Sequence, residues 1–521
     1  MAEGKDKPGW SLPVVFSPPV AGRRRIAAVR VAVGIALAAA LIAPVMQFQL
    51  GTMKSLRKAE AFDRSHPDWT RADALACGPV RPKSHKGAVG RWRQAVRQLW
   101  QGRNIYEAIP AGDRPYAHLP PEQVPVRMHP NMPLVVVLLT PFAYMPVWAM
   151  ALSFNLLKLA VLAGTLWMAV RLANHRGHRM AGWVLALSLV WSMKCIIGDI
   201  QHGNTNTFVL GAVVLHLWLY RSGRDTSAGA ALAAAICLKM TPALFVLYWL
   251  YQRNWKLLGG AAVAMVFFAV AVPLAAVGPG RYVELTDTWL NNLILPGLIR
   301  GDWYPEHINQ SLSGVMARYF LAGPPGNIFW GPDENPYEAQ KKFQWITFVA
   351  VSPGVLKIIV RILQLAIVAA IAWAVGWRRP GRDDGRRMLH YGLVLLGMML
   401  LNQRTWDHHS AVLLPASLGL WYAITYGRVS RRLRVAAVAV MIPAGLAVWL
   451  SGSGVVELIA RLAGLDAAGV HASGDIVEAY GPVFYHFALM LIAAVMLAVA
   501  LRKTEKPYFS AADGFSCGGV G

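Results

Sequence analysis

Four groups of polar residues lie within otherwise apolar sequence, and these are the residues best suited to chemistry. The first is the stretch LNQRTWDHHSAVLLP (401–415), which contains three types of ionisable side chain around one indole. Its candidate ligands are Arg404, Trp406, Asp407, His408 and His409. A charged side chain inside a membrane costs at least about 2.5 kcal/mol, so such residues indicate a functional site by default.

The other three groups combine amides with one lysine. They are GDIQHGNTNTF (198–208), CLKMTP (237–242) and HINQSLSGVMARYF (307–320). Their candidate ligands are Asn204, Asn206, Lys239, Asn309 and Gln310.

Each group also has a purely structural interpretation. Asn204 and Asn206 are suited to capping a helix or to hydrogen bonding between helices. Lys239 is long enough to reach an interface, and Asp407 is one helical turn from Arg404, close enough for an ion pair. The adjacent residues Asp407, His408 and His409 would point about 100° apart on a helix, so we expect no metal ion there.

The composition predicts a polytopic membrane protein. Of the 521 residues, 55% are hydrophobic and 15% are charged, against about 25% charged residues in soluble domains. The formal net charge of +24 comes mostly from short Lys and Arg clusters between apolar runs, a pattern that favours lipid surfaces over nucleic acid. The four cysteines form no CxxC pair, so neither a disulfide framework nor a metal site is indicated.

These residues must be positioned by membrane-spanning helices. Candidate spans are 26–48, 132–149, 150–171, 180–199, 205–220, 228–251, 256–278, 345–376, 388–403, 410–426, 433–451 and 481–501. They form a membrane domain over 26–501, with large outer loops at about 49–131 and 279–344 and cytoplasmic tails at 1–25 and 502–521. The arginines at 23–25 favour a cytoplasmic N-terminus, in a multi-pass protein of the cell membrane.

The number of spans depends on the segment 228–251. A single span there would place the basic clusters YRSGRD (220–225) and YQRNWK (251–256) on opposite sides of the membrane. A hairpin with Lys239 at its tip would keep both clusters on one side, so 11 to 13 spans are expected. In the first outer loop, 90–102 has the pattern of an amphipathic helix, lying either on the membrane or on the protein's own loop.

Six motifs, taken in order, resemble one family. They are AVRQLWQGRNIYE (95–107), HPNMPLVVVLLTPFAYMP (129–146), GNTN (203–206), KMTP (239–242), NQSLSG (309–314) and TWDHH (405–409). The sequence over about 90–420 is similar to glycosyltransferase family 87, the DUF2029 group of polyprenol-phosphate-mannose-dependent mannosyltransferases. This resemblance implies an all-α membrane protein of the GT-C fold.

The resemblance also implies an activity. A sugar, with mannose expected, would move from a polyprenyl phosphate to a hydroxyl of a lipid or glycan acceptor at the outer membrane face. The reaction would invert the anomeric carbon and need no nucleotide sugar, cofactor or metal. Arg404, His408, His409 and Lys239 would then face the phosphate, while Asn309, Gln310 and Trp406 would face the sugar.

The resemblance fails at the catalytic base. Where the family carries an aspartate before its first-loop motif, this sequence has Ala88. Asp63 and Asp68 are the candidate bases in the same loop, and Asp407 is a third. A transporter or flippase of a lipid-linked sugar is the alternative function, because polar residues on broken spans suit that role too. A noncatalytic membrane scaffold is the third possibility.

Overall fold

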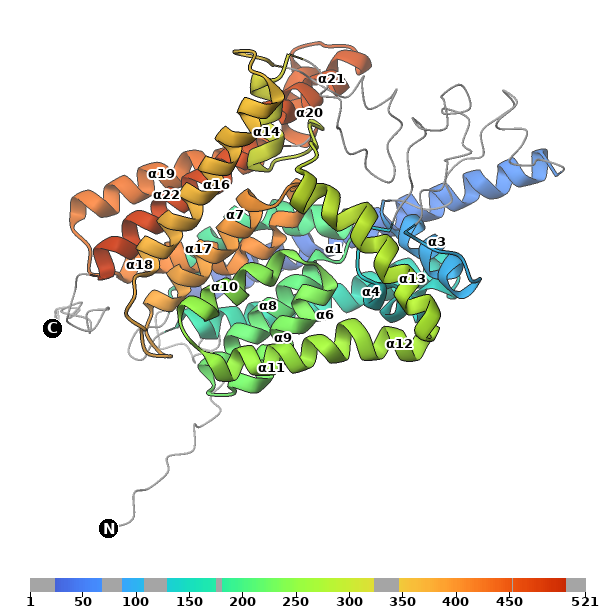
Figure 1. The fold of residues 1–521 in the computed structure, drawn as a ribbon. Helices are drawn as coiled ribbons and strands as arrows, with labels where there is room; N and C mark the ends of the chain where they lie inside the picture. The colour runs from blue at the N-terminus through green and yellow to red at the C-terminus, as the bar shows by residue number, and fades with distance from the viewer. Residues whose placement is uncertain are drawn as a thin grey trace.

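The fold is a bundle of helices with two regions of polar structure at its ends (Figure 1). The computed structural model describes residues 24–67, 87–106, 129–174, 180–322, 346–451 and 453–502. The regular elements in these ranges are helices, which confirms the expected all-α class. The division into one membrane domain and two tails stays a prediction.

Six helical segments in the described ranges are long and apolar enough to cross a membrane. They are α6 (Val147–Ala173), α7 (Gly182–His202), α11 to α12 (Trp255–Val277), α16 (Pro353–Val375), α19 (Arg431–Leu450) and Ser473–Arg502, which ends in α22 (Pro482–Arg502). Shorter helices pack among them: α8 (Asn206–Arg221), α17 (Arg386–Leu401) and α18 (Leu414–Tyr426). The protein is therefore a multi-pass membrane protein. Its sidedness and its full number of spans stay predictions.

The segment 228–251 forms a hairpin. It consists of α9 (Asp225–Leu238), a break at Lys239 and Met240, a short 3-10 turn and α10 (Leu244–Tyr251). Its two ends meet on His216. The Nδ1–H of His216 donates to the carbonyl of Ala228 at 2.8 Å, and its Nε2 accepts from Nε1 of Trp249 at 2.8 Å. With 14 residues, α9 extends about 21 Å, too short to cross the hydrocarbon layer. The hairpin expectation is confirmed, and the basic clusters at 220–225 and 251–256 lie on one face.

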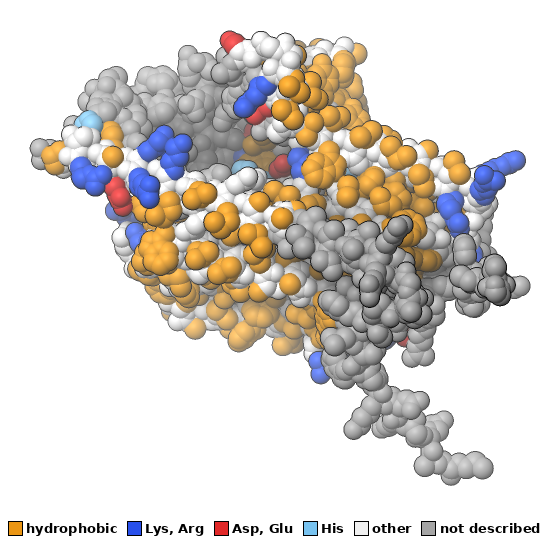
Figure 2. Space-filling model, turned by 180° about the vertical axis from the view of Figure 1, so that it is seen from behind, with side chains coloured by type: hydrophobic (Ala, Val, Ile, Leu, Met, Phe, Trp, Pro, Cys, Tyr) orange, Lys and Arg blue, Asp and Glu red, His pale blue; other side chains and the backbone are white. Residues whose placement is uncertain are grey.

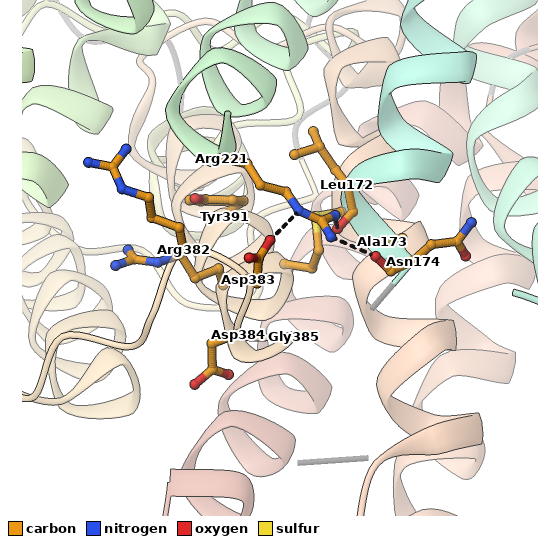
Figure 3. Close-up of a pocket in the computed structure, with 11 residues that line it drawn as sticks. Leu172, Ala173, Asn174, Arg221, Arg382, Asp383, Asp384, Gly385 and Tyr391 are labelled. Atoms are coloured by element: carbon orange, nitrogen blue, oxygen red, sulfur yellow. Dashed lines mark hydrogen bonds and ion pairs between the residues drawn. The ribbon is translucent and has the colours of Figure 1, made fainter. Parts of the chain in front are cut away.

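This face, here called the basic face, is held together by arginines from several helices. Arg221 donates to the carbonyls of Leu172 and Asn174, both at 2.9 Å, and pairs with Asp383 at 3.1 Å. Arg382 pairs with Asp225 at 2.6 Å. Figure 3 shows the pocket that these side chains line between the end of α6 and the loop before α17.

The predicted span 132–149 is wrong. Pro133, Pro141 and Pro146 divide it into α4 (Pro133–Leu138), α5 (Thr140–Ala143) and the start of α6. A proline lacks the backbone N–H that continues a helix, and neither fragment can span a bilayer. The fragments instead pack against the first-loop helix.

That first-loop helix is α3 (Val89–Trp100), as the amphipathic pattern predicts. Trp92, Val96 and Leu99 are buried at 5%, 0% and 2% exposure, in contact with α4, α5 and α6. Arg93 donates to the carbonyls of Ala143 at 2.8 Å and Met145 at 2.6 Å. Of the two interpretations of its apolar face, packing on the protein itself is the one observed.

The remaining helices frame the opposite end of the bundle. α1 (Arg24–Ser65) runs beyond the other described helices, and α13 (Pro279–Trp289) crosses α3 (Figure 1). π-helical turns follow at Leu290–Ile294 and Pro296–Arg300. A lobe of α14 (Leu312–Phe320), α20 (Ser453–Leu462) and α21 (Ala467–Ala479) stands over α16, α19 and α22.

Candidate active site

The polar motifs meet at the end of the bundle away from the basic face. α8 begins in this polar region at Asn206 and ends on the basic face at Arg221, so about 24 Å separate the two. Figure 2 shows that the surface is hollowed between the lobe and the main body, with acidic, basic and histidine side chains in the hollow.

The turn between α7 and α8 is shaped by Gly203. Its φ of +62° is a left-handed conformation that ends α7, and a Cβ atom there would lie 2.4 Å from Cγ2 of Val89. The N–H of Ala88 donates to the carbonyl of His202 at 2.8 Å, so α3 begins directly on this turn. The methyl group of Ala88, where the family resemblance predicts a carboxylate, therefore lies beside His202.

A buried ion pair fixes the first residues of α8. Lys158 of α6 and Asp199 of α7 are both fully buried, and Lys158 Nζ lies 3.0 Å from Asp199 Oδ2. The Asp199 carboxylate also accepts from the backbone and side chains of Asn206 and Thr207, at 2.6 to 3.2 Å. Five donors on one carboxylate satisfy a charge that would otherwise be costly to bury.

The hairpin tip joins this network. Lys239 Nζ donates to Oδ1 of Asn206 at 2.7 Å. Since Nδ2 of the same amide is held by Asp199, the side chain of Asn206 cannot turn without losing one of the two bonds. The chain Lys158–Asp199–Asn206–Lys239 thus sets the position of an ammonium group inside the hollow end of the bundle.

The segment TWDHH leads into a separate 3-10 element, η8 (Asp407–Leu413), which has Trp406 as its N-cap and lies outside the six candidate spans. The rings of His408 and His202 stack with centroids 4.6 Å apart, and those of Trp406 and His409 stack at 5.8 Å. Asn204 Nδ2 lies 2.9 Å from His408 Nε2. Residues from α7, the GNTN turn and η8 therefore form one cluster of rings, here called the ring cluster.

His409 is held as a neutral hydrogen-bond donor. Its Nδ1 accepts from the backbone N–H of Trp406 at 3.2 Å, so the proton of the neutral ring is on Nε2. Burial lowers the pKa of His409 well below its ordinary value, and the electrostatic effects of Lys239, Arg404 and the neighbouring histidines His408 and His202 lower it further. The groups that act on His409 are all cationic or imidazole, which indicates a site for an anion.

Arg404 lies at the edge of this cluster. Its guanidinium is 4.6 Å from the centre of the Trp406 ring and pairs with Glu306 at 2.8 Å. The indole Nε1 of Trp406 is buried and has no hydrogen-bond partner among the described residues. A cation, an imidazole N–H and a free indole N–H are thereby placed side by side.

Asn309 and Gln310 hold the chain that leads into η8. Asn309 is fully buried, donates to the carbonyls of Tyr304 and Gln403, and accepts from the N–H of Thr405, at 2.7 to 2.9 Å. Gln310 Nε2 donates to the carbonyls of His307 and Glu478 at 3.0 and 2.9 Å. Their amides are occupied by the backbone, so the geometry favours support of η8 over the predicted contact with a sugar.

The structure thus brings most of the predicted ligands together. Those in or beside the ring cluster are Asn204, Asn206, Lys239, Arg404, Trp406, Asp407, His408 and His409. It does not bring Asp63 to them, because this residue is exposed near the far end of α1 (Figure 1). Asp68 lies outside the described residues. The two loop aspartates remain untested as bases.

Four residues near the site were missed as ligands by the sequence interpretation: Lys158, Asp199, His202 and Glu306. Asp199 and His202 lie in a polar group that was recognised, and Lys158 is a lysine within the apolar run 150–171. Lys158 could have been recognised from the sequence, because an ionisable residue within a span indicates a functional or structural role. Glu306 offered no such signal, since it lies in a polar loop.

The fold defines a multi-pass helical membrane protein with ionisable and amide side chains gathered at one end of its bundle. Comparisons with known proteins identify its family. The model of glycosyltransferase family 87 matches residues 131–403, and the chain belongs to this family. It is therefore a membrane glycosyltransferase that uses a polyprenyl-phosphate sugar, and its family is one of those with the GT-C fold.

Two curated relatives are both described as polyprenol-phosphate-mannose-dependent alpha-(1-2)-phosphatidylinositol mannoside mannosyltransferases. The relative from Mycobacterium tuberculosis is 25% identical over 390 residues, which cover 72% of this chain and 77% of that protein. The relative from Mycolicibacterium smegmatis is 26% identical over 211 residues, which cover 38% of this chain and 46% of that protein. No solved structure is significantly similar to this chain.

Proposed function

We propose that this enzyme transfers mannose from a polyprenyl phosphate to a hydroxyl of a membrane lipid or glycan, at the outer face of the cell membrane. The transfer inverts the anomeric carbon and uses no metal ion. The relatives' named donor supports mannose, at 25% identity for the more extensive match. The basic face at the other end of the bundle supports a cytoplasmic position for that face, and hence an outer position for the ring cluster.

The observation that carries the proposal is the convergence of Lys239, Arg404 and His409 from distant parts of the chain. Lys239 and Arg404 both act on the pKa of His409, so the three groups share one electrostatic environment. The departing lipid phosphate develops negative charge on its bridging oxygen as the sugar leaves. Fixed cations and N–H donors aimed at that oxygen stabilise the transition state, which is the work that a metal ion does in other enzymes.

The sugar is proposed to lie between this phosphate site and the hollow. The free indole N–H of Trp406 is placed to donate to a sugar hydroxyl, and its ring offers an apolar face. Asn309 and Gln310 contribute by holding η8 in register, since their amides bond to the backbone. The acceptor attacks the anomeric carbon from the side opposite the phosphate, which gives inversion.

The test uses purified protein in liposomes with polyprenyl phosphates that carry mannose, glucose or a pentose, and with a native lipid extract as acceptor source. We expect a mannosylated product, formed equally well with EDTA present. Arg404→Gln and His409→Ala are expected to reduce the rate at least about tenfold. Movement of the donor between leaflets without a glycosylated product would instead support the transporter alternative.

A further inference from the structure

The transfer reaction needs a group that takes the proton of the acceptor hydroxyl. The first outer loop supplies none beside the ring cluster in the described residues, because position 88 is an alanine and Asp63 is exposed near the far end of α1. The other carboxylates around the cluster are Asp199, Glu306, Asp407, Asp475 and Glu478.

Four of these five carboxylates are committed to other contacts. Asp199 accepts from Lys158 and from the start of α8, and it is fully buried. Glu306 is 6% exposed and pairs with Arg404 at 2.8 Å. Asp475, which is 33% exposed, and Glu478, which is 19% exposed, face His307 of the lobe at 3.5 and 3.7 Å and not the ring cluster. A base that must release and regain a proton needs a carboxylate that is both open and in contact with the ring cluster.

Asp407 meets both conditions. Its side chain is 31% exposed, whereas the neighbouring His408 is 1% exposed. Its Oδ1 accepts from the backbone N–H of His408 at 2.6 Å and lies 3.3 Å from Nδ1 of the same ring. Its Oδ2 has no hydrogen-bond partner among the described residues, so this oxygen is available to a substrate.

The direction of these bonds is set by Asn204. The Oδ1 atom of Asn204 accepts from the N–H of Thr205 at 3.1 Å, which leaves its NH2 group to donate to His408 Nε2 at 2.9 Å. A neutral imidazole that accepts at Nε2 carries its proton on Nδ1, facing Asp407. The amide therefore fixes the tautomer of His408, whose Nδ1–H lies 3.3 Å from Oδ1 of Asp407 in an electrostatic contact, while the backbone N–H of His408 donates to the same oxygen.

The surrounding charges keep Asp407 ionised. Burial opposes the charged form, but the interaction with His408 and the electrostatic effects of Lys194 and His202 lower the pKa of Asp407 below its ordinary value. Glu478 of the lobe is close enough to Asp407 for the two carboxyl groups to interact electrostatically.

From this geometry we infer that Asp407 is the catalytic base of the transfer and that His408 and Asn204 are its positioning residues. The inference rests on the proposed function. The acceptor oxygen forms a bond to the anomeric carbon as the bond from that carbon to the phosphate oxygen breaks. The bonding pair leaves with polyprenyl phosphate, and the hydroxyl proton passes to Asp407 and then to water.

The experiment compares two nucleophiles in the same liposomes. A hydroxyl acceptor needs a base, whereas azide attacks the anomeric carbon as an anion and needs none. For Asp407→Asn we expect transfer to the lipid acceptors to fall at least about 100-fold, while the glycosyl azide forms within threefold of the wild-type rate. Arg404→Gln is expected to lose both products, because it acts on the leaving phosphate. Glu457→Gln, which removes one carboxylate from α20, is the matched control and should keep both.

Two results for Asp407→Asn, and a third for a loop variant, would overturn the assignment. One is transfer to hydroxyl acceptors by Asp407→Asn within threefold of wild type. The other is an equal loss of both products in Asp407→Asn, which would mark Asp407 as structural or donor-binding. Asp63→Asn is measured in parallel, and a selective loss of hydroxyl transfer there would assign the base to the loop instead. If the wild-type protein forms neither product from any donor, the proposed function itself fails, and the inference fails with it.

Discussion

Lys158 provides a sharp test of the network that positions the site. Lys158→Met keeps the length and much of the apolar surface of the side chain but removes its charge. The substitution leaves Asp199 as a fully buried carboxylate without its cation, although the donors from Asn206 and Thr207 remain. Breaking a buried pair in this way costs about 3–5 kcal/mol.

The effect should extend from stability to donor binding. Asp199 holds Nδ2 of Asn206 at 2.9 Å, and Oδ1 of that amide receives Lys239 at 2.7 Å. If Asp199 takes up a proton to relieve its charge, it loses acceptor capacity toward Asn206, and Lys239 loses its fixed partner. We therefore expect Lys158→Met to weaken the binding of a polyprenyl-phosphate sugar, although Lys158 itself lies outside the ring cluster.

The measurement is the free energy of SDS-induced unfolding for Lys158→Met, Asp199→Asn and the double variant. The two residues are in contact, so the double variant should be less destabilised than the sum of the single ones, by about 0.5–3 kcal/mol. Lys256→Met is the control, because this lysine is exposed at the start of α11. A loss below about 1 kcal/mol for Lys158→Met, or strict additivity in the cycle, would refute the buried pair as the anchor of the network.

Further predictions concern single residues of the site. Gly203→Ala should destabilise the protein by at least about 1–2 kcal/mol, measured by the same unfolding assay, because alanine is strained at φ +62° and its Cβ would meet Val89. Arg404→Lys should bind the donor more tightly than Arg404→Gln does, because lysine keeps the positive charge. It should bind the donor more weakly than wild type, because lysine loses the planar stacking on the indole of Trp406. Asn309→Ala should lower both stability and turnover without changing the choice of sugar. In the described residues its amide forms hydrogen bonds with backbone groups, so the amide supports η8. The pKa of His409 is lowered, so the folded protein binds fewer protons there than the unfolded chain does. Stability should therefore fall as the pH drops below the ordinary histidine value of about 6.5, and His409→Gln should flatten that slope in unfolding measurements at pH 5 to 7.

The polar residues inside apolar sequence were sufficient to identify residues that the structure brings together. A lysine, an arginine and two histidines in hydrocarbon are too costly to be incidental, so their positions alone indicated a wet, functional end of the bundle. A single span at 228–251 would have placed two basic clusters on opposite sides of the membrane, and this was enough to suggest the hairpin. These features depend on single residue types and short spacings, which a sequence states directly.

Local patterns were less informative where prolines interrupt apolar runs. The segment 132–149 has the composition of a span, but Pro141 and Pro146 break it into short helices that pack on α3. The apolar face of α3 could have packed either on the membrane or on the protein itself. Trp92 and Val96 are buried inside the protein, which is the second alternative. Hydrophobicity reports that a face will be covered, not whether lipid or protein covers it.

The sequence by itself determined the class of this protein, the six motifs and the residue types available to a phosphate and a sugar. Only the tertiary structure decided which of those residues meet. Lys158 and Asp199 are 41 positions apart, and Asn204 and His408 are 204 apart, yet each pair is in contact. Such contacts depend on how whole helices pack, since the geometry of a side chain is set by neighbours from other elements. For that reason the sequence left Asp407 as one of three possible bases, and we infer its role from its contact with the ring cluster.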